Sequence, residues 1–287
     1  MREGRPSETA SMVAFLRALA DGGATTAVGF SDPYAAAMLP ARWRRALPWV
    51  EGAIRWVPGA RRVAVRLDPI PLRMMVGDTA IATAIAAGAR RLVILGAGLD
   101  TRAHRLAGLG EVDVLEVDHP ATQAWKRRVA AGLPVLSRSL AYVPVDFERE
   151  TLGAGLAAYP PALTVWVWEG VIMYLTDAAL RASLADIARG SAAGSTLIAH
   201  YHEPGRRDVS GVAAYTRLVG EPMVGPRTRA QMHSFLAEAG FDVVEDIATP
   251  VWAERAGAAP PVGDVGRVGR IVVGRVRAAL TGTRCFE

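Results

Sequence analysis

Residues 91–118 read RLVILGAGLDTRAHRLAGLGEVDVLEVD, and this stretch decides the fold. It holds two short apolar runs, Arg91–Leu95 and Val112–Asp118, and a Gly-Ala-Gly turn directly follows the first. Runs that are apolar on both faces are typical of strands buried inside a parallel sheet. Three more runs of this kind follow at residues 142–147, 164–169 and 196–200.

Helical patterns lie between and after these runs. Residues 176–190 offer Thr176 as an N-cap, and residues 228–240 begin with a capping box formed by Thr228 and Gln231. Alternation of strands and helices predicts an α/β protein in which helices cover both faces of a parallel sheet.

The composition agrees with one α/β domain and an appendage. Of 287 residues, 51% are hydrophobic and 21% are charged, so the chain can bury a large core and is not expected to be disordered. The single cysteine, Cys285, excludes an intrachain disulfide and a cysteine-built metal site.

The net charge of +5 comes almost wholly from arginine, since Lys126 is the only lysine. The arginines are scattered and form no recognition-helix or zinc-finger pattern, so we expect no nucleic-acid partner. No apolar run is long enough to span a bilayer, and no targeting segment is visible. We therefore expect a cytoplasmic protein without a membrane partner.

The residues that follow the first two runs indicate an adenosine cofactor. Gly96 and Gly98 allow a tight turn and a close approach of backbone to ligand, and Asp118 can accept hydrogen bonds from ribose hydroxyls. A dinucleotide fingerprint would have a third glycine at Thr101, and Asp100 beside it would repel a pyrophosphate. The loop therefore favours S-adenosylmethionine over NAD.

Several motifs resemble those of the leucine carboxyl methyltransferase family, and more narrowly its bacterial branch of S-adenosylmethionine-dependent O-methyltransferases. They are residues 30–34 (FSDPY), 71–73, 92–106 (LVILGAGLDTRAHRL), 116–122 (EVDHPAT), 143–148 (VPVDFE), 168–176 (WEGVIMYLT) and 252–256 (WAERA). The resemblance covers roughly residues 9–278. It implies a Rossmann-like class I methyltransferase fold, with a seven-stranded, mostly parallel sheet, helices on both faces and an N-terminal helical lid.

The resemblance also assigns roles at the methionine end of the cofactor. Arg73 would pair with the methionine carboxylate, Gly96 and Gly98 would pass beneath the same part, and Glu169 would lie near the amino group. A carboxylate within the apolar stretch around Glu169 is costly to bury without a partner, and a cationic ligand is one reason to keep it there.

At the adenosine end, the resemblance implies that Asp118 holds the ribose. Asp146 would accept from the adenine amino group, and Phe147 would pack on the ring. The chain departs from the family at His104, where tyrosine is frequent, so any role of His104 beyond packing is in doubt.

The acceptor side is indicated by the cluster after the fifth apolar run. A carboxylate acceptor needs no general base, whereas a hydroxyl does, and His200 and His202 are then the candidate catalytic residues. We expect Tyr174 and Tyr201 to contact the acceptor. We expect no metal, because Asp242, Glu245 and Asp246 have the spacing of a solvated strand end.

The domain organisation follows from these assignments. Residues 1–70 are expected to form a helical lid, and residues 71–287 the S-adenosylmethionine-binding methyltransferase domain. Residues 42–57 carry Trp43, Trp49 and Trp56 with arginines between them. They favour a lid that lines the acceptor pocket with aromatic rings, and a helix lying on a membrane surface is the alternative.

The sequence thus predicts an enzyme that transfers a methyl group from S-adenosylmethionine to a carboxylate or hydroxyl oxygen of a small molecule, for example a natural-product intermediate. The alternatives are an NAD-dependent oxidoreductase and a protein that binds the nucleotide cofactor without catalysis. The oligomeric state is not predicted.

Overall fold

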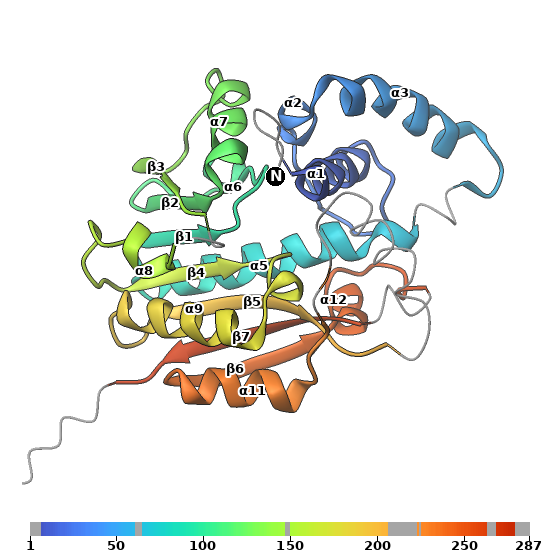
Figure 1. The fold of residues 1–287 in the computed structure, drawn as a ribbon. Helices are drawn as coiled ribbons and strands as arrows, with labels where there is room; N and C mark the ends of the chain where they lie inside the picture. Colours follow the sequence, from blue (N-terminus) through green and yellow to red (C-terminus); the bar gives the residue numbers. More distant parts are fainter. Residues whose placement is uncertain are drawn as a thin grey trace, which may run out of the picture.

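The fold is described from a computed structural model, which places residues 7–60, 65–146, 150–205, 223, 225–262 and 268–278. Its centre is one seven-stranded sheet of order β3-β2-β1-β4-β5-β7-β6 (Figure 1). The strands are β1 (Arg91–Leu95), β2 (Asp113–Asp118), β3 (Ser139–Pro144), β4 (Thr164–Trp168), β5 (Thr196–His202), β6 (Phe241–Ala248) and β7 (Gly269–Val276). The first five pair in parallel, and β7 runs antiparallel to both β5 and β6. The predicted seven-stranded, mostly parallel sheet is confirmed.

The predicted strands differ from the observed ones mainly at their ends. The first predicted strand matches β1 at both ends. The third was predicted at residues 142–147, but β3 begins at Ser139 and ends at Pro144, so Asp146 lies past the strand instead of near its end. β5 continues to His202, which places His200 and His202 on the same face of the sheet.

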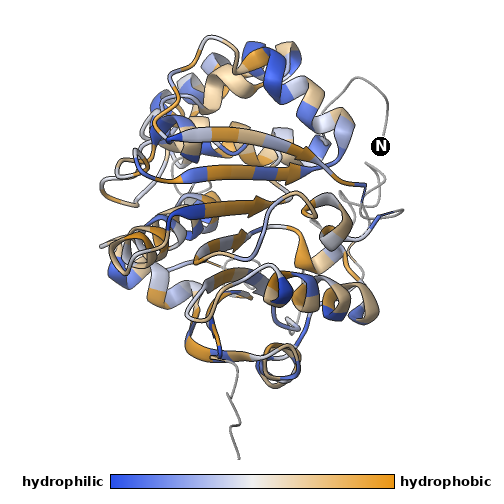
Figure 2. Ribbon diagram, turned by 90° about the vertical axis from the view of Figure 1, so that its left-hand side faces the viewer, coloured by the Kyte–Doolittle hydropathy of each residue, from blue (hydrophilic) through white to orange (hydrophobic). Residues whose placement is uncertain are grey.

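Helices cover both faces of the sheet, as predicted. Alternate residues of β1 show the two layers. Leu92 and Ile94 belong to the core beneath α5 (Pro69–Ala86) and α12 (Thr249–Arg255), whereas Val93 and Leu95 belong to the core beneath α9 (Asp177–Arg189) and α11 (Arg229–Glu238). Figure 2 shows the largely hydrophobic strands between these layers. Shorter elements complete the body: α6 (Arg102–Arg105), α7 (Pro120–Val129), α8 (Leu152–Gly155), η1 (Val65–Leu67) and η2 (Ile172–Tyr174).

The two predicted helices begin where their caps lie. The Thr176 hydroxyl accepts from the Ala179 N–H at the start of α9. Thr228 and Gln231 form the expected capping box of α11, and Gly240 follows that helix with a φ of +89°. The Thr176 and Thr228 side chains thus each satisfy a backbone N–H group that the start of a helix leaves without a partner.

The amino-terminal region forms a third, smaller core. It consists of α1 (Glu8–Asp21), α2 (Ala35–Met38) and α3 (Ala41–Trp56), and α1 contacts the other two helices and α5. Because α5 begins at Pro69, the boundary expected after residue 70 falls inside its first turn. Among the described residues, no helix is both long and apolar enough to cross a membrane.

Candidate functional site

A cavity of about 460 Å³ lies at the carboxyl ends of β1, β2 and β4. The strand order reverses between β1 and β4, which is where open α/β sheets bind ligands. Seven predicted site residues line this one cavity: Arg73, Gly96, Gly98, Asp118, Asp146, Glu169 and Tyr174. Phe147 lies outside the described residues.

The turn after β1 needs its glycines. Gly96 and Gly98 have φ values of +61° and +50°, a region that side chains disfavour. A Cβ on Gly96 would lie 2.3 Å from Val171 Cγ2, so the turn also packs too tightly for any larger residue. This geometry brings the backbone of the turn to the floor of the cavity.

Asp118 closes the turn from the end of β2. Its carboxylate accepts from the N–H of Gly98, and it also accepts from the N–H of His119 at 2.6 Å. Burial raises the pKa of Asp118, while these two N–H groups oppose that shift. Next to it, His119 Nε2 lies 3.9 Å from Asp146 Oδ2. The two acids expected at the adenosine end therefore flank the same histidine.

Glu169 has protein partners that the sequence did not indicate. Its Oε2 lies 3.3 Å from Arg73 Nε, and its Oε1 accepts from Arg102 at 2.8 Å. The sequence had suggested that a cationic ligand compensates this buried carboxylate, but two arginines of the protein already neutralise it. Gly77 on α5 makes room for the pair, since a Cβ there would lie 2.4 Å from Glu169 Oε1 and 2.9 Å from an Arg102 nitrogen.

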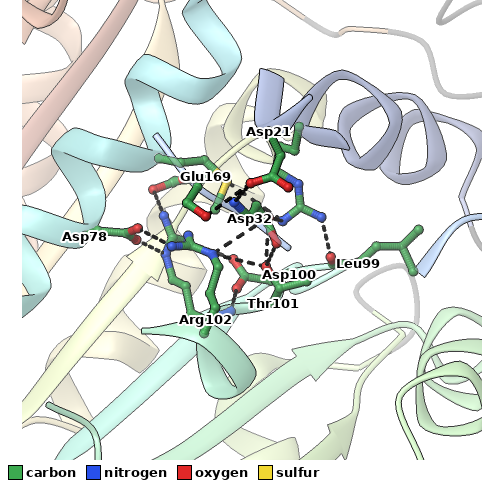
Figure 3. A network of polar contacts seen from close by, with 12 residues as sticks. Asp21, Asp32, Asp78, Leu99, Asp100, Thr101, Arg102 and Glu169 are labelled. Atoms are coloured by element: carbon green, nitrogen blue, oxygen red, sulfur yellow. Dashed lines mark hydrogen bonds and ion pairs between the residues drawn. The ribbon is translucent and has the colours of Figure 1, made fainter. Parts of the chain in front are cut away.

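Arg102 is the centre of a wider charge network (Figure 3). It is fully buried, and besides Glu169 it contacts Asp78 at 2.6 Å and Asp100 at 2.8 Å. Burial alone would raise the pKa of Asp100, but Arg102 holds it below its usual range. Asp100 is thus a paired anion, which weakens the expectation that it repels a pyrophosphate.

A second part of the network connects the amino-terminal region to the turn. The Thr101 hydroxyl, completely buried, lies 2.8 Å from both carboxylate oxygens of Asp32, a residue of the FSDPY motif. Arg17 of α1 lies 3.2 Å from Asp32 Oδ2 and donates to the Leu99 carbonyl oxygen at 2.5 Å. Thr101, read above as a missing glycine, therefore holds the amino-terminal region against the turn.

Arg73 faces the cavity with unused hydrogen-bonding capacity. It is only 7% exposed, and none of the hydrogen bonds among the described residues uses its guanidinium. Burial lowers its pKa; Glu169 opposes this, while Arg102 and Arg17 add to it. An anionic ligand group beside Arg73 would stabilise its charged form, which burial and the two neighbouring arginines disfavour.

His200 and His202 lie together but do not line this cavity. Their rings are 4.9 Å apart, edge to face, and His200 packs on Trp252. Both Nδ1 atoms are buried and have no hydrogen-bond partner among the residues that the structure describes. Burial, and then Arg73, lowers the pKa of His202 to about 4 and holds the pKa of His200 well below its usual range, so both rings are neutral at pH 7.

Tyr201 lies in the opposite core from its two histidine neighbours. It is 1% exposed, and its hydroxyl donates to Asp246 at 2.8 Å. Its expected role in acceptor binding finds no support in this position. Asp246 is not solvated, as had been expected, because its side chain is buried and also contacts His233 at 2.7 Å and Arg270 at 2.8 Å.

Two further expectations concern aromatic and histidine side chains. His104 is buried, and its Nδ1 lies 2.8 Å from the Pro134 carbonyl oxygen, which makes it a packing residue in this structure. The idea that the α3 tryptophans line the acceptor pocket is wrong for Trp49 and Trp56, which are exposed to solvent. Trp43 packs on Phe15 of α1 instead.

A larger hollow of about 820 Å³ opens at the other end of the sheet. Its lining includes Thr164 and Thr196, which begin β4 and β5, and the small side chains of α5. Its lining also includes the exposed ion pair of Arg255 and Glu245, whereas the glycine turn after β1 and the buried charges around Arg102 line the smaller cavity. No group of three or more potential metal ligands occurs in the described part of the chain.

The sheet order, the glycine turn and the ribose-type acid define a Rossmann-like fold of the class I methyltransferase type. The family model of the leucine carboxyl methyltransferases matches residues 10–188 of this chain, and the chain belongs to that family. A protein of Mycolicibacterium vanbaalenii named "Putative S-adenosyl-L-methionine-dependent methyltransferase" is 30% identical, over 92% of each chain. One of the same name from Mycobacterium marinum is 32% identical over 66% of this chain and 63% of its own.

Two crystal structures share the fold at low identity. A DUF574 family protein from Streptomyces avermitilis has a TM-score of 0.62 at 17% identity, over 95% of this chain and 98% of its own. A "putative methyltransferase" from Thermobifida fusca YX has a TM-score of 0.58 at 18% identity, over 96% of each chain.

Proposed function

We propose that the protein is an S-adenosylmethionine-dependent O-methyltransferase whose acceptor is a small molecule with an ionised oxygen, a carboxylate before a hydroxyl. One observation carries the proposal: the cavity at the strand-order reversal brings a buried, underused arginine, a paired glutamate and a ribose-type acid around a glycine turn. The mycobacterial relatives bear this cofactor in their names.

The cavity fits a ligand with both an anionic and a cationic group. Its volume lies within the range of small-molecule sites, about 300–1,000 Å³. Arg73 offers its guanidinium to a carboxylate, and Glu169 beside it offers a carboxylate to an ammonium group. The α-amino acid end of S-adenosylmethionine has this pair of charges.

The remaining residues would hold the adenosine. Asp118 keeps lone pairs beyond the two backbone N–H groups that it accepts, and these are available to ribose hydroxyls. Asp146 would accept from the adenine amino group on the other side of His119. Phe147 as the packing partner of the ring stays a prediction from the family resemblance.

The bound cofactor would supply a methyl group on a good, neutral leaving group, so the protein chiefly has to align the acceptor and exclude water. Exclusion of water would fall to the amino-terminal region. Ser7, Ala10, Val13 and Arg17 of this region line the cavity, and Arg17 and Asp32 hold it on the turn. This is the lid role proposed for residues 1–70.

The histidines favour an acceptor that needs no strong base. A general base works best when its pKa lies near the working pH, and His202, with a pKa of about 4, is far below that of a phenol or alcohol. A carboxylate is already ionised at neutral pH. In that case His200 and His202 would contribute polarity near Arg73 and would not remove a proton.

Thermal unfolding with S-adenosylmethionine, its demethylated product and NAD tests the cofactor. A ligand at about a hundred times its Kd adds about 2.7 kcal/mol of stability, which should raise the Tm by about 5–10 °C. We expect this shift with the first two compounds, and a loss of the shift in Arg73→Met but not in Arg138→Met, an arginine exposed beside Asp113. A shift with NAD alone would refute the proposal.

The acceptor class needs a separate measurement. Transfer of labelled methyl to a panel of carboxylic acids and phenols is compared between the wild type and His202→Gln. A carboxylate acceptor predicts rates within a few-fold of each other and no ionisation near neutral pH in kcat. A loss of about a hundredfold or more in the variant, confined to phenols, would instead identify His202 as the base.

A further inference from the structure

Two tryptophans of α3 face solvent instead of the protein. Trp49 is 82% exposed and Trp56 is 77% exposed, and Val57 directly after the helix is 54% exposed. Indole rings have an apolar body and a polar N–H, and exposed pairs of them are uncommon unless a partner covers them. α3 forms the outer edge of the amino-terminal region, away from the sheet (Figure 1).

The exposed rings belong to one stripe along the helix. Trp49 and Trp56 are seven residues apart, two turns or about 10.5 Å along the axis, so they point the same way. Arg42 and Arg45 precede Trp49 by seven and four residues and share its face. The only buried residue of α3, Leu47, lies on the opposite side, where the helix packs against α1.

The charge of this stripe has one sign. The helix carries Arg42, Arg44, Arg45 and Arg55, against Glu51 as its only acid. Arg42 pairs with Glu8, and Arg55 stacks over Trp56 at 5.3 Å, but neither Arg44 nor Arg45 has an ion-pair partner among the residues that the structure places. Helices that lie in a membrane interface combine the same two residue types, arginine for the anionic headgroups and tryptophan for the boundary with the acyl chains.

We propose that this outward face of α3, the Arg42–Trp56 stripe, docks on an anionic phospholipid surface. The helix would lie in the plane of the headgroups, with the two indole rings inserted at the boundary of the acyl chains. The arginines would meet the lipid phosphates, with guanidinium groups suited to bidentate contacts.

Two other partners fit this face less well. A second copy of the chain would bring the arginines of both stripes together, because a two-fold contact pairs like with like. Single-stranded nucleic acid is usually bound in a positively charged groove with stacking rings, whereas α3 is a protruding helix at the edge of the molecule. A flat anionic surface matches a convex stripe on a helix at the edge of the molecule.

Co-sedimentation of the full chain with vesicles tests the proposal. One set is pure phosphatidylcholine, and the other contains about a third phosphatidylglycerol, an anionic lipid. The variants are Trp49→Ser with Trp56→Ser, and Arg45→Gln with Arg55→Gln. Matched controls remove exposed groups elsewhere: Val28→Ser with Val244→Ser, and Arg181→Gln with Arg189→Gln. Unchanged melting temperatures would establish that all variants fold.

We expect binding to the anionic vesicles only, weakening with added salt. The arginine variant should lose about thirtyfold in partition coefficient, from about 1 kcal/mol per arginine near the surface, and the tryptophan variant about tenfold or more. Absence of wild-type binding, or equal loss in the controls, would overturn the proposal. The proposal would also be overturned by self-association, measured by light scattering, or by oligonucleotide binding, if the tryptophan variant alone abolished it.

Discussion

Replacement of Arg102 by methionine would remove the centre of the buried charge network. Arg102 is fully buried and contacts Asp78, Asp100 and Glu169 at 2.6–2.8 Å. Asp78 keeps Arg105, and Glu169 keeps Arg73, so Asp100 is the carboxylate left without a cation. Breaking a buried pair from one side costs about 3–5 kcal/mol, because the remaining charge stays desolvated.

For a chain of this length that loss should lower the Tm by about 6–20 °C. Urea unfolding should show a lower midpoint with an unchanged slope, since the surface exposed on unfolding is the same. Because Arg102 holds the pKa of Asp100 down, its removal lets Asp100 take up a proton more readily. The difference between Arg102→Met and the wild type should therefore shrink as the pH falls from neutral towards 4.

The matched control is Arg138→Met, which breaks an exposed pair with Asp113. Exposed pairs contribute little, so its Tm should stay near that of the wild type. Arg102→Lys keeps the charge but cannot contact three carboxylates in one plane, and should lie between the two. If Arg102→Met is as stable as Arg138→Met, the network does not have the energetic role assigned to it here.

Three shorter predictions test individual contacts. Asp118→Ala should weaken the binding of S-adenosylmethionine about 10- to 100-fold by calorimetry, because charge-assisted hydrogen bonds to the ribose are lost; unchanged affinity would remove the ribose assignment. The lowered pKa of His202 means that the unfolded state binds more protons than the folded state between pH 6.5 and 4, so the free energy of unfolding falls by up to about 3 kcal/mol as the pH is lowered through that range. In His202→Gln this part of the pH dependence should vanish in melts at several pH values, and an unchanged pH dependence would refute it. Gly77→Ala should gain about 1 kcal/mol of helix propensity yet displace Glu169 and Arg102, so the melt should change little while cofactor affinity falls; equal affinity would show that the pair can shift without consequence.

The strands and caps could be predicted because their signal is local. A strand buried on both faces is apolar along its buried length, as residues 92–95 of β1 and 165–168 of β4 are. The hydroxyl of Thr176 acts within one turn of its own position. β3 was placed less well, since only one of its six residues is buried and its sequence alternates less clearly.

The partners of charged side chains could not be predicted in the same way. Glu169 and Asp246 are both acids in the sequence, but one lies between two arginines and the other beside a tyrosine, a histidine and an arginine. Each of these contacts joins residues that are distant in the chain, and a single sequence has no signal for them. The only lysine illustrates this, since Lys126 is buried 2.6 Å from Glu116. The one available hint lay in the FSDPY motif, whose Asp32 turned out to hold Thr101 and Arg17.

The balance of charge in the network bears on which ligand the cavity can take. Its side chains are four arginines and four carboxylates: Arg17, Arg73, Arg102, Arg105, Asp32, Asp78, Asp100 and Glu169. A ligand that brought one uncompensated charge into such a buried, neutral set would meet a large desolvation cost. An α-amino acid group brings one charge of each sign, and Arg73 and Glu169 can exchange part of their mutual contact for it. The sulfonium then leaves one positive charge, which the Asp118 carboxylate lining the same cavity or an acceptor carboxylate would balance, so the charges of the site suit the zwitterionic cofactor and are compatible with a carboxylate acceptor.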